Sequence, residues 1–244
     1  MSTQVGLDDY VSGGYYLTRP VARGWPSELL PATLLSASSC ISTFFPDDWA
    51  IEWVTSRRPE ERVTAAKAMG IDVDRLPEAI RWATDALSRD FGWPNVFYTL
   101  ESAREARARS LRESCDTVIM GLGLHRADTA VLLDATEPPE ANPGYATVGE
   151  TGIFQCVRDA DDVADGGQIA GFELLSTFYG IFVCSWLHLG LEKQCAEELR
   201  IRPNASGFVE SYDDARQCAE FIQNDAKHND PGLWLPWLIV TYPC

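Results

Sequence analysis

Apolar positions near the start of the chain alternate with other residues in the manner of short strands. Trp49, Ile51 and Trp53 are separated by single residues, and this period of two is typical of a half-buried strand. Residues 15–17 follow a glycine pair and are a second strand candidate. The pattern predicts strands and loops for about the first 55 residues.

Helical spacing of apolar residues begins after this region and predicts three helices. The first starts near Ser56, carries Pro59 in its first turn and ends at Gly70. The second has Asp74 as its cap and apolar residues at 80, 83, 87 and 91. The third begins at Asn95.

A strand-rich block is predicted next. Residues 117–125 and 129–135 flank a short polar turn and read as a hairpin. Residues 152–158 and 169–176 are further strand candidates. Between them, residues 137–144 contain three prolines and a glycine and form a loop. This loop is also the candidate for a boundary between two subdomains, although the strands beyond it read as continuations of one sheet.

The last third predicts a helix over residues 186–199, a second helix and a closing strand. Ser211 and Asp214 form a capping box at the start of the second helix. Pro236, within the strand at 234–242, belongs at a bulge or a sheet edge. Because helices and strands do not alternate regularly, we predict an α+β fold, with a mainly antiparallel sheet, several helices packed on it and a single domain over residues 1–244.

The net charge of the chain limits the classes of partner that it is expected to bind. The chain has 20 basic and 36 acidic side chains and a net charge of −16. Such a field repels nucleic acids and anionic lipid surfaces and attracts basic proteins. The alternative is that the charge serves solubility alone. The N-terminus has no signal-peptide pattern, and no apolar run approaches the roughly 20 residues of a membrane span, so we expect a cytoplasmic protein that does not bind membranes.

The cysteines and the missing motifs argue against standard catalytic or metal folds. Seven cysteines occur at wide spacing without C-x-x-C, which argues against a disulfide framework or a zinc ribbon. The glycine and histidine signatures of common enzymes are missing as well. The sequence therefore favours a protein that is not an enzyme, and we assign it no cofactor and no metal.

One constellation nevertheless has reactive residue types at helical spacing. On a helix, Cys184, His188, Glu192 and Cys195 would share one side. Such a stripe suits a zinc ion or a thiol nucleophile with its base. The leucines on the same side make a core-facing surface the alternative.

A second candidate is His125, which follows Gly121 and Gly123 on one face of a predicted strand. Paired glycines allow another backbone or a ligand to approach closely. The alternative for His125 is an ordinary exposed strand end. The acidic loop at 159–167 lacks the residue order of an EF-hand and is expected to be solvated.

Tryptophans in the last third are candidates for binding anchors. Trp186, Trp234 and Trp237 have the apolar body and polar N–H that suit interfaces, and a core of large aromatic residues is the alternative. The segments Gly171-Phe172-Glu173, Cys184-Ser185-Trp186-Leu187, Gly190-Leu191-Glu192 and Trp234-Leu235-Pro236-Trp237 together resemble uncharacterised bacterial proteins. The resemblance implies that Trp186 and residues 234–237 belong to one shared feature.

These observations lead to one principal expectation and two alternatives. We expect a non-catalytic binding protein, of the immunity or inhibitor type, for a basic protein partner. The first alternative is a small-molecule enzyme with a site near His125 or at Cys184 and His188. The second is an assembly or scaffold component. The oligomeric state does not follow from the sequence.

Overall fold

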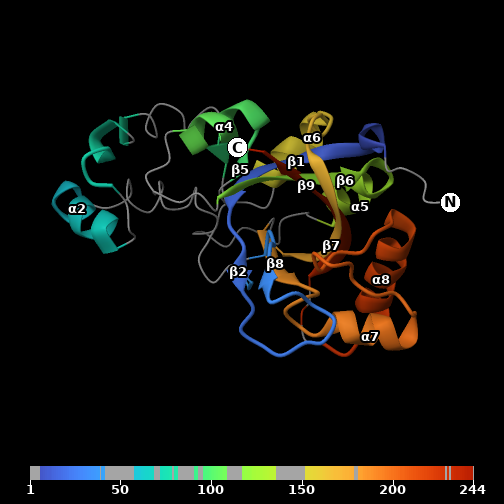
Figure 1. The fold of residues 1–244 in the computed structure, drawn as a ribbon. Helices are drawn as coiled ribbons and strands as arrows, with labels where there is room; N and C mark the ends of the chain where they lie inside the picture. Colours follow the sequence, from blue (N-terminus) through green and yellow to red (C-terminus); the bar gives the residue numbers. More distant parts are fainter. Residues whose placement is uncertain are drawn as a thin grey trace.

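The computed structural model describes residues 6–38, 40–41, 58–68, 72–78, 80–81, 91–92, 96–108, 117–135, 152–178, 181–228, 230 and 232–243. Its main feature is a twisted seven-stranded sheet in which all neighbouring strands run antiparallel (Figure 1). In spatial order the strands are β4 (Phe91–Gly92), β5 (Val96–Phe97), β1 (Tyr10–Thr18), β6 (Val118–His125), β9 (Leu233–Tyr242), β7 (Gln168–Phe178) and β8 (Ile181–Ser185). A small separate sheet pairs β2 (Val21–Ala22) with β3 (Thr33–Leu34).

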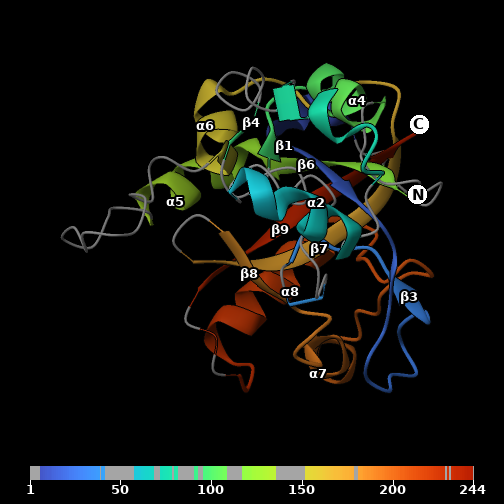
Figure 2. The ribbon, with the colours of Figure 1, turned by 90° about the vertical axis from the view of Figure 1, so that its left-hand side faces the viewer.

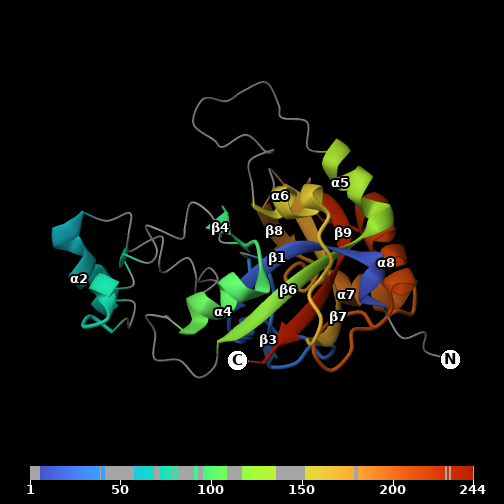
Figure 3. The ribbon, with the colours of Figure 1, turned by 90° about the horizontal axis from the view of Figure 1, so that it is seen from above.

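The helices lie on both faces of the large sheet, except for one that lies beside it. They are α2 (Pro59–Ala68), α4 (Leu100–Ala108), α5 (Thr129–Asp134), α6 (Gly152–Asp159), α7 (Leu191–Glu198) and α8 (Tyr212–Asn224), with 3-10 turns η1 (Leu7–Asp9) and η2 (Arg126–Asp128). Figure 2 shows α6 above the strands and α7 and α8 below them. Figure 3 shows α2 beside the sheet rather than over it. The prediction of an α+β fold with a mainly antiparallel sheet is confirmed.

Two clusters of buried side chains form the core, one on each face. On one face, Phe154 of α6 and Leu132 of α5 belong to the cluster of Leu122 on β6. On the other, Ile222 of α8 belongs to the cluster of Leu174 on β7. Because the central strands are covered on both faces, nearly every side chain along β9 is buried. Any polar residue on these strands must therefore find its partners inside the protein.

The glycine pair of β6 does permit a close approach, and the approaching groups are side chains of this chain. A Cβ at Gly121 would lie 2.8 Å from the Tyr242 ring, and one at Gly123 would lie 3.0 Å from Val163. The space that these glycines leave is thus filled by the core.

Several predicted elements are confirmed with adjusted bounds. The helix expected from Ser56 is α2, and the helix expected from Asn95 is α4, which begins only at Leu100. The strands predicted at 15–17, 117–125, 169–176 and 234–242 are β1, β6, β7 and β9. Of the second predicted helix, residues 76–78 and 80–81 are helical, whereas Phe91, which was expected on the same helix, lies in strand β4. The strand predicted at Trp49–Trp53 and the loop at 137–144 lie outside the described residues, and strands on either side of that loop belong to one sheet.

Two strand predictions were wrong. Residues 129–135 form helix α5 after the turn η2, so the predicted hairpin does not exist. Residues 152–158 form helix α6, in which Ile153, Phe154, Cys156 and Val157 are buried together. That spacing places all four on one side of a helix, and burying this side against the sheet outweighs the strand preference of the β-branched and aromatic residues.

Pro236 sits inside the sheet rather than at its edge, because β9 lies between β6 and β7. Its partner on β7 is Leu174, whereas pairing with β6 ends at Leu124 and Trp237. Pro236 therefore lies one residue beyond the end of the pairing between β9 and β6, so its missing N–H interrupts none of the described pairs of these two strands.

The predicted cap of α8 is confirmed and gives a simple test. The Ser211 hydroxyl accepts a hydrogen bond from the Asp214 backbone N–H at 3.2 Å. We expect Ser211→Ala to lower the free energy of unfolding by about 1 kcal/mol, because one N–H of the first turn loses its partner. Urea unfolding followed by circular dichroism measures this change. Ser206→Ala, at an exposed position outside any helix, is the control and should leave the stability unchanged.

Within the described residues, no helix is long and apolar enough to cross a membrane.

Candidate functional site

The predicted stripe of Cys184, His188, Glu192 and Cys195 does not lie on one helix. Cys184 is on strand β8, His188 lies in the turn that follows, and only Glu192 and Cys195 are on α7. The helix predicted over 186–199 therefore begins at Leu191, after Gly190 with φ of 70°. The structure keeps Cys184 and His188 together and separates them from the other two residues.

Cys184 and His188 meet a third ligand-type side chain, Cys40. The Sγ atoms of Cys184 and Cys40 are 3.5 Å apart, and Cys184 Sγ lies 3.8 Å from His188 Nδ1. Cys184 is buried, Cys40 is half-buried and His188 is exposed. The thiol of Cys184 donates to Cys40, which lowers the pKa of Cys40 and raises that of Cys184. The cluster thus lies at the protein surface, and the hydrogen bond between its two thiols lowers the pKa of Cys40.

A buried carboxylate anchors the segment that carries Cys40. Glu173 on β7 has no exposed surface, and it accepts hydrogen bonds from the Ser36 hydroxyl and, at 3.2 Å, from the Ala37 N–H. The Ser185 hydroxyl is a further partner. Because burial outweighs these bonds, the pKa of Glu173 rises to about 7.

Two serine turns connect this anchor to Cys40. The Ser38 N–H donates to the Ser36 hydroxyl at 3.0 Å, and the Cys40 N–H donates to the Ser38 hydroxyl at 3.2 Å. The position of Cys40 is therefore set by hydrogen bonds that begin at Glu173.

A histidine–aspartate pair lies close enough to the two thiols for its charge to act on them. Asp230 accepts hydrogen bonds from the Ser176 hydroxyl and from the Gly232 N–H at 2.8 Å. His228 accepts from the Asp230 N–H at 3.1 Å. Ser176 is paired with Cys184 across β7 and β8. The negative charge of Asp230 acts to raise the pKa of both Cys40 and Cys184. An acidic side chain thus contributes to the electrostatic surroundings of both thiols.

Glu192 and Cys195, the other members of the predicted stripe, have separate surroundings. Glu192 is buried and accepts from the Ser27 hydroxyl at 3.1 Å through one oxygen, while its second oxygen has no partner. Burial raises its pKa. Cys195 is hydrogen-bonded to Cys218 of α8, and both thiols are fully buried. Neither residue joins the Cys40 cluster.

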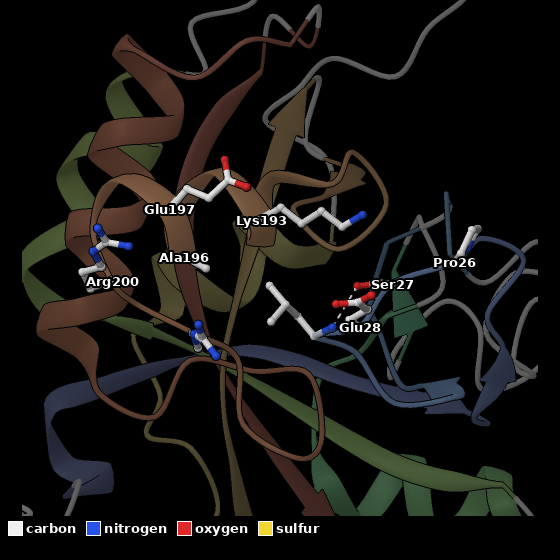
Figure 4. A pocket seen from close by; sticks show the side chains of 9 residues that line it. Pro26, Ser27, Glu28, Lys193, Ala196, Glu197 and Arg200 are labelled. Carbon is white, nitrogen blue, oxygen red and sulfur yellow. Dashed lines mark hydrogen bonds between the residues drawn. The ribbon is translucent and has the colours of Figure 1, made fainter.

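A cavity of about 540 Å³ opens between α7 and the segment before β3. Figure 4 shows Lys193, Ala196 and Glu197 of α7 facing Ser27 and Glu28. Arg200 and Arg202 complete its cationic side. A second cavity of about 540 Å³ is lined by uncharged residues near the start of β7, including Gln168, Asn204 and Ser206. Neither cavity is lined by His125, Cys184 or His188.

His125 lies at the opposite part of the sheet, at the end of β6. Its ring stacks on Tyr212 of α8 with centroids 4.0 Å apart, and its Nδ1 accepts from the Ala127 N–H at 3.2 Å. The Tyr212 hydroxyl donates to Asp128 at 2.7 Å. Strands β9 and β7 separate β6 from β8, so the structure does not combine His125 with Cys184 and His188.

Carboxylates gather around this end of the sheet. The Ser12 N–H donates to the Asp161 carbonyl at 2.7 Å, and Arg126 contacts the Asp8 carbonyl and the Asp162 carboxylate. Burial, followed by the charges of Asp9, Asp128 and Asp213, raises the pKa of the Tyr10 hydroxyl. The loop predicted to be acidic thus lies close to η1 and to the start of α8. We call this region the acidic end, and its exposed members are Asp8, Asp9, Asp161, Asp162, Asp213 and Asp214.

The three predicted tryptophan anchors lie in the core. Trp186 and Trp237 have no exposed surface and Trp234 has 2%. Trp186 and Trp234 share one core cluster, whereas Trp237 lies in the other and packs against Phe182 at 4.8 Å between centroids. Their positions agree with the alternative of an aromatic core, and a partner cannot reach them in this conformation.

Comparisons with known proteins found no matching family model, no matching curated protein and no matching solved structure. The resemblance of the C-terminal segments to uncharacterised bacterial proteins stays a prediction.

Proposed function

We propose that this chain is a non-catalytic binding protein of the immunity or inhibitor type and that a basic protein docks at its acidic end. The observation that carries the proposal is the convergence of six exposed aspartates from three separate segments around the His125–Tyr212 stack. The net charge of −16 acts in the same direction. A concentrated negative field speeds the encounter with a cationic surface.

The His125–Tyr212 stack adds aromatic contact surface to the charge of the acidic end. Tyr212 and His125 are half-buried, so each ring presents an edge or face beside the carboxylates. Interfaces favour such rings because they contribute apolar contact area and a polar group with little loss of conformational freedom. Two cations near these carboxylates, Arg126 and Arg216, pair with Asp162 and Glu220.

The rival hypothesis of a small-molecule enzyme has less support from the described residues. An enzyme site needs a concave pocket that holds its reactive groups. The two cavities described above are lined by none of the candidate catalytic side chains, His125, Cys184 and His188.

Two charge variants test the proposal. The first changes four acidic-end residues to asparagine: Asp8, Asp9, Asp161 and Asp213. The second changes four exposed glutamates elsewhere to glutamine, so that the net charge falls equally: Glu28, Glu60, Glu197 and Glu198. We expect the wild-type chain and the second variant to capture the same basic protein from source lysate. The first variant should associate with that protein at least about 10-fold more slowly at low salt.

The measurement is the association rate of the captured protein by surface plasmon resonance at two salt concentrations. Equal rates for the two variants, or capture of no basic protein by the wild type, would contradict the proposal.

A further inference from the structure

The cluster of Cys40, Cys184 and His188 has a donor set that metal ions recognise. Its three ligand atoms, two Sγ and one imidazole nitrogen, all lie within 4.8 Å of one another. They come from three places in the fold: the segment anchored on Glu173, the end of β8 and the turn after it. Within the described part of the chain, no other group of histidine, cysteine and carboxylate side chains comes this close.

Two of the three distances between these atoms are close to the edges of a zinc tetrahedron. With Zn–S near about 2.3 Å and Zn–N near about 2.0 Å, a regular tetrahedron has edges of about 3.8 Å between two sulfurs and about 3.5 Å between sulfur and nitrogen. The corresponding distances here are 3.5 Å between the sulfurs and 3.8 Å from Cys184 Sγ to His188 Nδ1. Along these two edges an ion would require shifts of a few tenths of an ångström, and the third pair, Cys40 and His188, lies within 4.8 Å.

We propose that Cys40, Cys184 and His188 form a Zn²⁺ site with three protein ligands and one position open to solvent. Thiolate and imidazole are the ligands that zinc prefers, and three protein ligands leave the fourth position for water or another donor. The exposed His188 and the half-buried Cys40 place that position at the surface.

The surroundings hold each ligand in place. The backbone N–H of His188 donates to the Ser185 carbonyl at 3.0 Å. The Trp25 ring packs edge-on against the His188 imidazole, with the ring centroids 5.4 Å apart. Cys40 is fixed by the serine turns described above. Ordered supports of this kind keep a site close to its binding geometry before the ion arrives.

A second thiol pair provides an internal control. Cys195 and Cys218 are hydrogen-bonded to each other in the core, but no imidazole joins them among the described residues. If paired thiols alone captured the metal, this pair would also bind it. The Cys218→Ala variant removes one thiol, as Cys40→Ser does, and leaves the proposed site intact.

The test is zinc binding by the purified full-length chain under argon with a phosphine reductant. We expect one equivalent of Zn²⁺ per chain by elemental analysis. Titration with Co²⁺ should give the visible bands of a tetrahedral ion and a thiolate-to-cobalt absorption. His188→Ala and Cys40→Ser should weaken binding by more than the roughly 10- to 100-fold that loss of an outer supporting group causes. Cys218→Ala should bind as the wild type does.

Three results would overturn the proposal. They are a wild-type chain that binds no Zn²⁺ or Co²⁺, a His188→Ala variant that binds both with unchanged affinity, and a Cys40–Cys184 disulfide in protein kept under reductant. Since His188 is exposed, its variant should fold, and circular dichroism confirms this before titration. The outcome is independent of the docking of a basic protein at the acidic end.

Discussion

Between about pH 5 and about pH 8, the wild-type chain is expected to lose about 3 kcal/mol of stability relative to its Glu173→Gln variant. Burial raises the pKa of Glu173 from 4.5 to about 7 in the folded chain. Between these two pKa values the folded state retains a proton that the unfolded chain has already released. Raising the pH therefore removes stability until the pH passes about 7, and above that value the penalty is constant.

The glutamine variant separates charge from hydrogen bonding. Its carbonyl oxygen can still accept from Ser36, but its amide group would face the Ala37 N–H, which is also a donor. That mismatch lowers stability equally at every pH, so the change in the difference with pH reports the ionisation of Glu173.

Denaturant unfolding at four pH values measures the effect, with Glu198→Gln as the control on the exposed side of α7. The control should follow the wild-type curve. Parallel stability curves for the wild type and Glu173→Gln would contradict the prediction, because they would mean that folding does not shift the pKa of Glu173.

Gly171→Ala is expected to destabilise the fold by about 3 to 5 kcal/mol. Gly171 has a φ of +128°, which residues with a side chain rarely adopt, and an added Cβ would lie 2.7 Å from the Val209 carbonyl oxygen. That oxygen accepts from the Phe172 N–H at 2.7 Å, and Val209 donates back at 2.9 Å. Since the obstacle is backbone in a paired segment, it cannot move aside without breaking both bonds.

Gly166→Ala isolates the strain from the clash. Gly166 also has a positive φ, of +84°, but nothing lies within 4 Å of an added Cβ. We expect it to lower stability by only about 1 kcal/mol. Thermal and urea unfolding of both variants gives the comparison, and equal losses would mean that the contact with residue 209 does not limit position 171.

The sequence predicted the long, strongly patterned elements and failed on short apolar runs. Helix α8 has a clear cap and helical spacing, and both were read correctly. Residues 129–135 and 152–158 are short and apolar, and such runs fit a strand or a buried helix equally well. For α6, the absence of strict alternation at Ile153-Phe154 and Cys156-Val157 was the signal for a helix.

The candidate site was predicted only in part, because its third ligand is remote in sequence. Cys184 and His188 are close in the chain, but Cys40 is 144 residues from Cys184, and no local pattern connects them. The sequence did contain a signal for the buried position of Glu173. It stands between Phe172 and Leu174 on a strand whose two faces are otherwise apolar. A carboxyl at an inward position of such a strand must find donors inside the protein.

Strand β7 is longer than its outer neighbour, and this difference affects how the molecule behaves with copies of itself. β8 pairs only with residues 175–178 of β7, and the stretch around Phe172 is covered by Val209 from the loop before α8. If that loop detached, the bare N–H and C=O groups of β7 would form a template for a strand from a second molecule. Pairing with Val209 therefore keeps this part of the β7 edge from pairing with another molecule. We expect variants that loosen the loop to form β-rich aggregates before the rest of the fold melts.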